Sequence, residues 1–330
     1  MIEPAGLRVL FVSNMYPNET NPRSGIFVAR QAESLVEAGV EVVTEPIAGV
    51  RGERDYLESR RRIRRLLGTF RPDIIHAHYG YTQVAVAGQS VGYVVTLYGD
   101  DLNGESRGDG GITLKSRIGI AVTQSFGLLA RRILVQSRAM QARLWKGLRA
   151  RSEVLGSGVD ETVFSPAPRR EARQRLGLAD GRIVLAFVNS GGQPTKRLDL
   201  AMATQDELIR QGHDAQLLVA EKVPASEMRW YYQAADVLLM TSDFEGSPNC
   251  VKEALACGVP VVSVAVGDVP QVVTKPEQGS IVDRDPAALA QGVQRILRLR
   301  PDRRHSLLPH ALRASTVAQR LIAIYSAARQ

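Results

Sequence analysis

Two glutamates and the turn between them are the most informative group of side chains in the sequence. Glu245 and Glu253 lie eight positions apart, with Pro248 between them. Proline is typical of the first helical turn, where backbone N–H groups have no partner and lie at the positive helix end. Such an end can bind a diphosphate. The expected phosphate-binding residues are Gly246, Ser247, Pro248, Asn249, Cys250 and Val251.

The two glutamates differ in position relative to this helix end. Glu253 is five residues into the helix, far enough from the phosphates to accept hydrogen bonds from the paired hydroxyls of a ribose. Glu245 precedes the helix and is placed to meet a sugar beyond the phosphates. The alternative is an ordinary helix with two surface carboxylates. The strong helix stop at Gly258 and Pro260, followed by an apolar strand, favours the functional interpretation.

A basic pair, Lys196 and Arg197, stands where the helix after the predicted strand 183–188 begins. Cations are mildly unfavourable beside a helix N-terminus unless an anion receives them. We therefore expect both side chains to neutralise a bound phosphate. A solvated surface pair is the alternative, since exposed Lys and Arg are abundant.

Polar residues also follow strands in the first half of the chain. Gly25, after the first strand, would let a ligand approach the backbone, although a turn glycine is the alternative. His76 and His78 point to one face of a strand, but the sequence offers no further ligands for a metal. Tyr98, near Asp101, can donate a hydrogen bond to a sugar hydroxyl.

These residues need elements that bring them together. Apolar segments of strand length alternate with segments of helical period, which predicts an α/β fold of two doubly wound parallel sheets. Ligands lie beyond the carboxyl ends of such strands, so a cleft between two lobes is the expected site. The predicted strands are 7–12, 40–44, 74–77, 93–97 and 133–136, then 183–188, 216–220, 237–241, 261–264 and 280–282.

The length of 330 residues exceeds that at which a single core usually keeps growing. Segments 156–160 and 164–168 are rich in glycine and proline and suit an ordered connector. We expect an N-terminal lobe over 1–160 and a C-terminal lobe over 165–312. The final helix, 315–330, with Ser315 as its N-cap, should pack back on the N-terminal lobe.

Composition excludes several classes of protein. Hydrophobic residues at 44% and charged residues at 23% are typical of a soluble globular chain, and no apolar run is long enough to cross a membrane. The start of the chain does not resemble a signal peptide. Cys250 and Cys257 have no metal-ligand spacing and are expected to be buried free thiols in a reducing compartment. The expected location is the cytoplasm.

The net charge of +8 favours anionic partners. Residues 60–67 form a dense basic cluster, from Arg60 to Leu67. One interpretation is a solvated helix face. The other is a patch that contacts an anionic acceptor or the inner face of a membrane peripherally. Nothing in the sequence predicts a nucleic-acid partner.

Residues 243–262 resemble the donor signature of glycosyltransferase family 4, in which seven residues separate two glutamates. The resemblance implies the GT-B fold, a donor ribose on Glu253 and the transferred sugar on Glu245, near its C3 and C4 hydroxyls. Many members place an arginine soon after the strand that precedes the basic pair. Asn189 and Ser190 occupy that position in this chain, so Lys196 and Arg197 are expected to take over the role of the missing arginine.

In the N-terminal half, the resemblance places the loop of Gly25 near the donor phosphates and acceptor. It places His78 on the acceptor side of the cleft, with Asp101 as a further substrate residue. Tyr98 stands where the family usually has histidine, and a phenol cannot become cationic.

The resemblance implies a retaining enzyme of hexosyltransferase type that uses a nucleoside diphosphate sugar, with UDP favoured, and needs neither metal nor other cofactor. Glu245, Lys196 and Arg197 are the expected catalytic residues of a front-face transfer to a small molecule, a glycan or a lipid-linked acceptor. The alternatives are a phosphorylase or sugar-nucleotide epimerase on the same scaffold, and a protein that binds a nucleotide sugar or polyanion without turnover.

Overall fold

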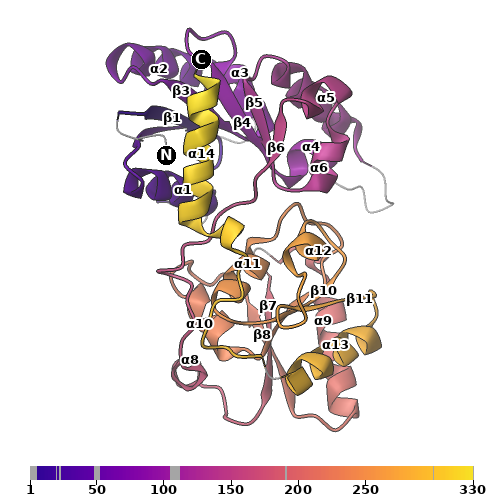
Figure 1. Ribbon diagram of the computed structural model, residues 1–330. Coiled ribbons are helices and arrows are strands. Elements are labelled where there is room, and N and C mark those ends of the chain that lie inside the picture. The colour runs from indigo at the N-terminus through magenta and orange to yellow at the C-terminus, as the bar shows by residue number, and fades with distance from the viewer. Residues whose placement is uncertain are drawn as a thin grey trace. The chain divides into compact units, whose positions relative to one another are not determined.

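The computed structural model divides the chain into two compact units, residues 1–158 with 314–330 and residues 159–313. In Figure 1 each unit is a sheet with helices on its faces. The structure describes residues 6–19, 21, 24–47, 53–104, 112–189, 192–299 and 301–329, and the side chains of 53 and 54 are outside the description.

The N-terminal unit contains a six-stranded parallel sheet in the order β2-β1-β3-β4-β5-β6. Its central strands β3 and β4 are buried along their whole length, because helices cover both faces. The strands are β1 (Arg8–Ser13), β2 (Glu41–Pro46), β3 (Ile74–His78), β4 (Tyr93–Leu97), β5 (Arg132–Val135) and β6 (Ser152–Val154).

Helices α1 and α14 share one apolar core, and α14 lies beside α1 in Figure 1. The last helix thus packs within the N-terminal unit. It begins at Ala314, so Ser315 lies inside its first turn and the predicted N-cap is wrong by two positions. The helices are α1 (Ile26–Glu37), α2 (Glu53–Thr69), α3 (Gln83–Val86), α4 (Gly99–Asn103), α5 (Leu114–Gly127), α6 (Arg138–Arg143), α7 (Lys146–Arg149) and α14 (Ala314–Ala328), with a 3-10 turn, η1 (Gly80–Thr82).

The C-terminal unit contains a five-stranded parallel sheet in the order β11-β10-β9-β7-β8. Helices α9 and α13 pack against one face, and α10, α11 and α12 against the other. The elements are α8 (Arg169–Arg175), β7 (Ile183–Val188), η2 (Pro194–Lys196), α9 (Leu198–Arg210), β8 (Ala215–Ala220), α10 (Met228–Ala234), β9 (Val237–Met240), α11 (Asn249–Ala256), β10 (Val261–Val264), α12 (Val269–Val272), β11 (Gly279–Val282), α13 (Pro286–Leu299) and η3 (His310–Leu312).

Each sheet has one point at which the strand order reverses. In the N-terminal unit it lies between β1 and β3, and in the C-terminal unit between β7 and β9. The loops that leave the two strands diverge there, which opens space for a ligand beyond their carboxyl ends. Residues 192–197 and 241–249 meet at the C-terminal reversal point, where the amide of Asp243 donates to the carbonyl of Thr195 at 2.8 Å.

The prediction of two doubly wound parallel sheets is confirmed. Strands β4, β7 and β10 have the predicted bounds, and the other predicted strands differ by at most two residues at either end. Strand β6 was missed. Its three half-buried residues, Ser-Glu-Val, carry no apolar run that could indicate a strand.

Candidate functional site

Lys196 and Arg197 lie at the reversal point of the C-terminal sheet. Lys196 ends η2, and Arg197 precedes the first residue of α9 with a left-handed φ of 57°. The hydroxyl of Thr241, just after β9, donates to the carbonyl oxygens of Lys196 at 2.8 Å and of Arg197 at 3.0 Å. The end of β9 therefore fixes the backbone that carries both cations.

Lys196 and Glu245 form an ion pair between the loops that follow β7 and β9. The Lys196 Nζ lies 2.5 Å from the Glu245 Oε1, and the two side chains are 19% and 13% exposed. Burial lowers the pKa of Lys196, but the carboxylate of Glu245 more than offsets this, so the pKa is raised above its ordinary value. The ammonium is therefore charged at neutral pH, and two predicted catalytic residues touch.

Arg197 is held by carboxylates. Its Nε donates to the Asp199 Oδ1 at 2.9 Å, and its Nη1 donates to the Asp243 Oδ1 at 3.3 Å. These hydrogen bonds, led by those to Asp199, raise its pKa. Arg284 also donates to the Asp243 Oδ1, at 2.9 Å. A phosphate that bound Arg197 would compete with the carboxylates of Asp199 and Asp243. The sequence analysis did not predict these two ion pairs.

The start of α11 differs by one residue from the prediction. Pro248 is the N-cap, and the helix begins at Asn249. The amide of Val251 donates to the carbonyl of Pro248 at 3.2 Å, so the prediction that it lacks a partner is wrong. The amides of Asn249 and Cys250 precede this first bond and lie at the positive end of the helix.

The turn before α11 is held by contacts with residues 267 and 268. The hydroxyl of Ser247 donates to the Asp268 Oδ2, and the fully buried Lys252 has its Nζ 3.9 Å from the same oxygen. A Cβ at Gly267 would lie only 3.0 Å from the carbonyl oxygen of Gly246. Lys252 and Asp268 escaped the sequence analysis, because a lysine on a helix ordinarily indicates an exposed position.

Glu253 is held by a buried tyrosine from α10. The hydroxyl of Tyr232 donates to the Glu253 Oε2 at 2.7 Å, and Tyr232 has no exposed surface. Burial first, and then the negative charge of Glu253, raise the pKa of Tyr232, so the phenol stays protonated as a donor. Tyr232 positions the glutamate that the sequence assigns to a ribose.

The thiol of Cys250 shows how close these groups are to one another. Burial raises its pKa to about 12, Lys196 acts in the opposite direction, and Glu245 and Glu253 raise it further. One thiol at the start of α11 thus lies within electrostatic reach of all three charged side chains. The structure brings them together around one helix end, as the sequence predicts.

The histidines of β3 are buried and neutral. His76 Nδ1 lies 2.6 Å from the Tyr325 hydroxyl and its Nε2 lies 2.7 Å from the Thr96 hydroxyl, while burial lowers its pKa to about 3. His78 has no exposed surface, and burial, followed by the effect of His76, lowers its pKa. His78 Nδ1 lies 3.0 Å from the Tyr98 hydroxyl. The hydroxyl expected to bind a sugar therefore contacts His78.

Asp101 connects two loops of the N-terminal unit. Its Oδ1 accepts from the amide of Gly80 at 2.9 Å, and its Oδ2 accepts from the amide of Tyr98 at 2.8 Å. Burial raises its pKa to about 7, against the opposing effect of the two amides. Both carboxylate oxygens thus accept hydrogen bonds inside the protein, which gives Asp101 a positioning role, and its contact with a substrate stays a prediction.

Position 25 requires glycine because of its backbone conformation and a close contact with residue 15. Gly25 has a left-handed φ of 60°, and a Cβ there would lie 2.0 Å from the carbonyl oxygen of Met15. The space in which a side chain would lie is thus filled by residue 15, which is why this position needs glycine. The approach of a ligand to this backbone stays a prediction.

Gly25→Ala is expected to destabilise the protein by more than the 1–2 kcal/mol that left-handed strain costs, because the methyl group also displaces the Met15 carbonyl. Denaturant unfolding of the full chain measures this. Gly88→Ala is the matched control, since Gly88 has φ +68 but its Cβ would meet only the flexible end of Arg60, at 3.6 Å. Equal losses in the two variants would contradict the crowding argument.

Comparison with known proteins places both units in one family. The Glycosyltransferase Family 4 model matches residues 3–163, and the Glycosyl transferases group 1 model matches residues 169–299. The putative teichuronic acid biosynthesis glycosyltransferase TuaC of Bacillus subtilis (strain 168) is 24% identical, with 88% of this chain and 89% of that protein covered.

Two further proteins share part of the sequence or the fold. D-inositol 3-phosphate glycosyltransferase of Geodermatophilus obscurus is 30% identical over 54% of this chain and 48% of its own length. HepE of Anabaena, solved with UDP and glucose, has a TM-score of 0.69 at 16% identity, with 97% of this chain and 99% of that chain covered. The two units have the GT-B fold, and the chain is a glycosyltransferase that belongs to glycosyltransferase family 4.

Proposed function

We propose that this glycosyltransferase takes its sugar from a nucleoside diphosphate donor, UDP by preference, and that the C-terminal unit binds the donor. The observation that carries the proposal is the ion pair of Lys196 with Glu245, a residue that precedes α11, the helix that carries Glu253. A cation and unpaired helix amides suit a diphosphate, and the carboxylates suit sugar hydroxyls. HepE, which shares the fold, was solved with UDP.

In this proposal the departing nucleoside diphosphate receives most of the catalytic stabilisation. Negative charge develops on it as the glycosidic bond breaks, and Lys196 with the amides of Asn249 and Cys250 would face that charge. Glu253, held by Tyr232, would accept hydrogen bonds from the ribose. These groups supply positive charge without a metal, so we propose a metal-independent reaction with no other cofactor.

We propose retention of anomeric configuration by front-face transfer. Glu245 is the carboxylate nearest to the expected sugar position, and its ion pair with Lys196 suits hydrogen bonding to sugar hydroxyls better than nucleophilic attack. Proton NMR of the first-formed product gives its anomeric configuration. An inverted product would refute this part of the proposal.

The acceptor is proposed to be anionic. The net charge of +8 favours such a molecule, and one relative is named for D-inositol 3-phosphate. Membrane contact through α2 would be electrostatic, because Ile63, Leu66 and Leu67 pack into the core. The exposed residues of the cluster are Arg61, Arg64 and Arg65. No helix within the described ranges is long and apolar enough to cross a bilayer.

Calorimetric titration of UDP, GDP and ADP into the full chain, at two salt concentrations and with a chelator present, tests the donor assignment. One nucleotide is expected to bind preferentially without metal. Binding that falls steeply with salt and does not distinguish the bases would instead favour a polyanion-binding protein. Conversion of a nucleotide sugar in the absence of any acceptor would favour an epimerase.

A further inference from the structure

A cavity lies in the C-terminal unit, at the end of the sheet where strands β7 and β9 begin. Its volume is about 680 Å³, and its lining includes Asp236, which immediately precedes β9. Lys196 and Glu245 follow the carboxyl ends of β7 and β9, whereas Asp236 bonds to Val184 near the amino ends of these strands. The cavity is thus separate from the proposed donor site, and its volume is typical of a small-molecule site.

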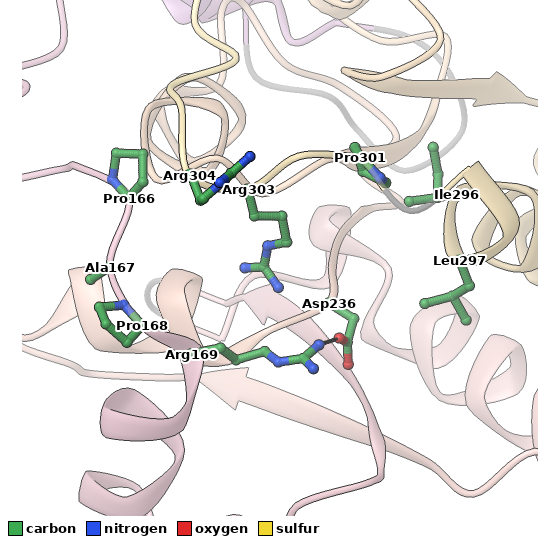
Figure 2. A pocket seen from close by; sticks show the side chains of 10 residues that line it. All are labelled: Pro166, Ala167, Pro168, Arg169, Asp236, Ile296, Leu297, Pro301, Arg303 and Arg304. Carbon is green, nitrogen blue, oxygen red and sulfur yellow. Dashed lines mark hydrogen bonds and ion pairs between the residues drawn. The ribbon is translucent and has the colours of Figure 1, made fainter.

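The charges around this cavity are mostly positive. Arg169, Arg303 and Arg304 line it together with one carboxylate, Asp236, and Figure 2 shows Arg303 extending toward Arg169 and Asp236. The almost fully buried Arg173 adds a fourth guanidinium to the cluster, since its Nη2 lies 2.8 Å from the Asp236 Oδ2.

The carboxylate of Asp236 is already engaged. Its Oδ1 accepts from Arg169, and its Oδ2 accepts from Arg173 and from the amide of Val184, each at 2.8 Å. The single negative charge of Asp236 is therefore shared by two arginines and a backbone amide. It leaves the cavity with an excess of positive charge.

Two nitrogen atoms of the Arg303 guanidinium group have no hydrogen-bond partner among the described residues. Its Nε and Nη1 are buried, and neither has a hydrogen bond among the described residues. Burial lowers its pKa to about 10, although Asp236 opposes the shift and Arg169 and Arg173 add to it. Two buried N–H donors without hydrogen bonds are costly, and a ligand oxygen that reached them would remove that cost.

The remaining walls are apolar. Ile296 and Leu297 from α13 lie on one side, and the segment 166–168, Pro-Ala-Pro, lies on the other (Figure 2). A free inorganic ion would leave these walls without contact. A phosphate ester with a compact organic body satisfies both the guanidinium groups and the walls.

We propose that this cavity is a binding site for a phosphorylated small molecule, with its phosphate on Arg303 and Arg169. The Nε and Nη1 of Arg303 each offer an N–H donor that has no partner among the described residues. Arg304, which is exposed and paired with Asp302, stands at the rim and steers anions inward.

The site and the proposed donor site belong to opposite ends of α11. The donor residues on this segment lie before α11 or within its first five residues, whereas the segment of Arg303 is attached at its last turn. The amide of Leu307 donates to the carbonyl of Leu255 at 2.8 Å, and a Cβ at Gly258 would lie 2.9 Å from the carbonyl oxygen of Arg303. Both sites can therefore be occupied at once.

Calorimetry of the full chain tests the site, with inorganic phosphate, glucose 6-phosphate and AMP as probes at constant ionic strength, with and without saturating UDP. We expect an ester to bind more tightly than inorganic phosphate, at one site per chain, in the presence of UDP. Arg303→Gln should weaken it at least tenfold. Arg295→Gln, an exposed arginine of α13 outside the cavity lining, should not.

Equal weakening in the two variants, or no binding of any probe, would overturn the proposal. If Lys196→Ala abolished ester binding, the ester would occupy the donor site and the proposal would fail. Failure of UDP to bind concerns the proposed function alone, since the ester titration is also made without UDP. Binding of anionic phosphatidylglycerol vesicles that depends on Arg303, without binding of soluble esters, would assign the surface to a membrane and overturn the proposal.

Melting temperatures provide a second measurement. Arg303→Met should melt at a higher temperature than the wild type in phosphate-free buffer, because it removes two buried N–H donors that have no hydrogen bond. The bound ester should raise the melting temperature of the wild type and leave that of the variant unchanged. A lower melting temperature for Arg303→Met would show that the arginine is structural, which contradicts the proposal.

Discussion

Lys196→Ala is expected to lower kcat for sugar transfer by about 10²–10³-fold, the range measured when one preorganised charge-stabilising donor is removed from an active site. The ammonium is charged, 19% exposed and bonded to Glu245 across the reversal point. Its proposed partner is the leaving diphosphate, which gains negative charge only as the bond breaks. Steady-state rates with a saturating nucleotide sugar measure the effect.

Two variants make this result specific. Lys275→Ala removes a lysine from an exposed position of the same unit and should leave kcat unchanged. Lys196→Arg keeps the positive charge and should recover part of the rate, although the longer fork fits the Glu245 contact less well. If Lys196→Ala raised KM and left kcat intact, Lys196 would bind ground state and transition state equally, and its catalytic assignment would be wrong.

Glu253→Ala is expected to weaken donor binding by about 1.5–3 kcal/mol, the value of hydrogen bonds to a charged group, which is roughly a ten- to hundredfold change in Kd. The carboxylate would accept from the ribose while Tyr232 holds its Oε2 at 2.7 Å. Calorimetric titration of the preferred nucleotide measures the loss. Unchanged affinity would refute the ribose assignment.

The same substitution should also destabilise the fold, and this effect must be separated from binding. Removal of Glu253 leaves the hydroxyl of the buried Tyr232 without this acceptor, at a cost of about 1–3 kcal/mol in the free energy of unfolding. Tyr232→Phe keeps the carboxylate and removes its brace, so it should weaken the nucleotide less than Glu253→Ala does. If both variants lost the same affinity, Glu253 would act through the structure instead of through the ribose.

Local sequence was sufficient for the architecture and for the outline of the C-terminal site. Strand lengths, helix stops and connectors predict two parallel sheets, because hydrophobic period and turn chemistry are properties of neighbouring residues. The cluster around α11 could be predicted because the turn, the helix and Glu253 are contiguous. Lys196 joined them because it follows the neighbouring strand.

For the first half of the chain, the expected substrate contacts stay predictions. His78, Tyr98 and Asp101 were expected to bind substrate, but the structure shows bonds within the N-terminal unit for each. A polar residue at the end of a strand has the same sequence pattern whether it contacts a ligand or a neighbouring loop. Whether such a residue contacts a ligand or a loop depends on how deeply the loops bury its side chain.

By itself, the sequence determined the fold class, the family and the set of residues from which a donor site could be built. Tertiary structure decided which of these residues are bonded to one another and which partners hold them. Tyr232, Asp268 and Arg303 acquired their roles in this way, because burial makes each polar group depend on partners from distant segments. Burial and partner identity are properties of packing, and a local pattern of residues does not contain them.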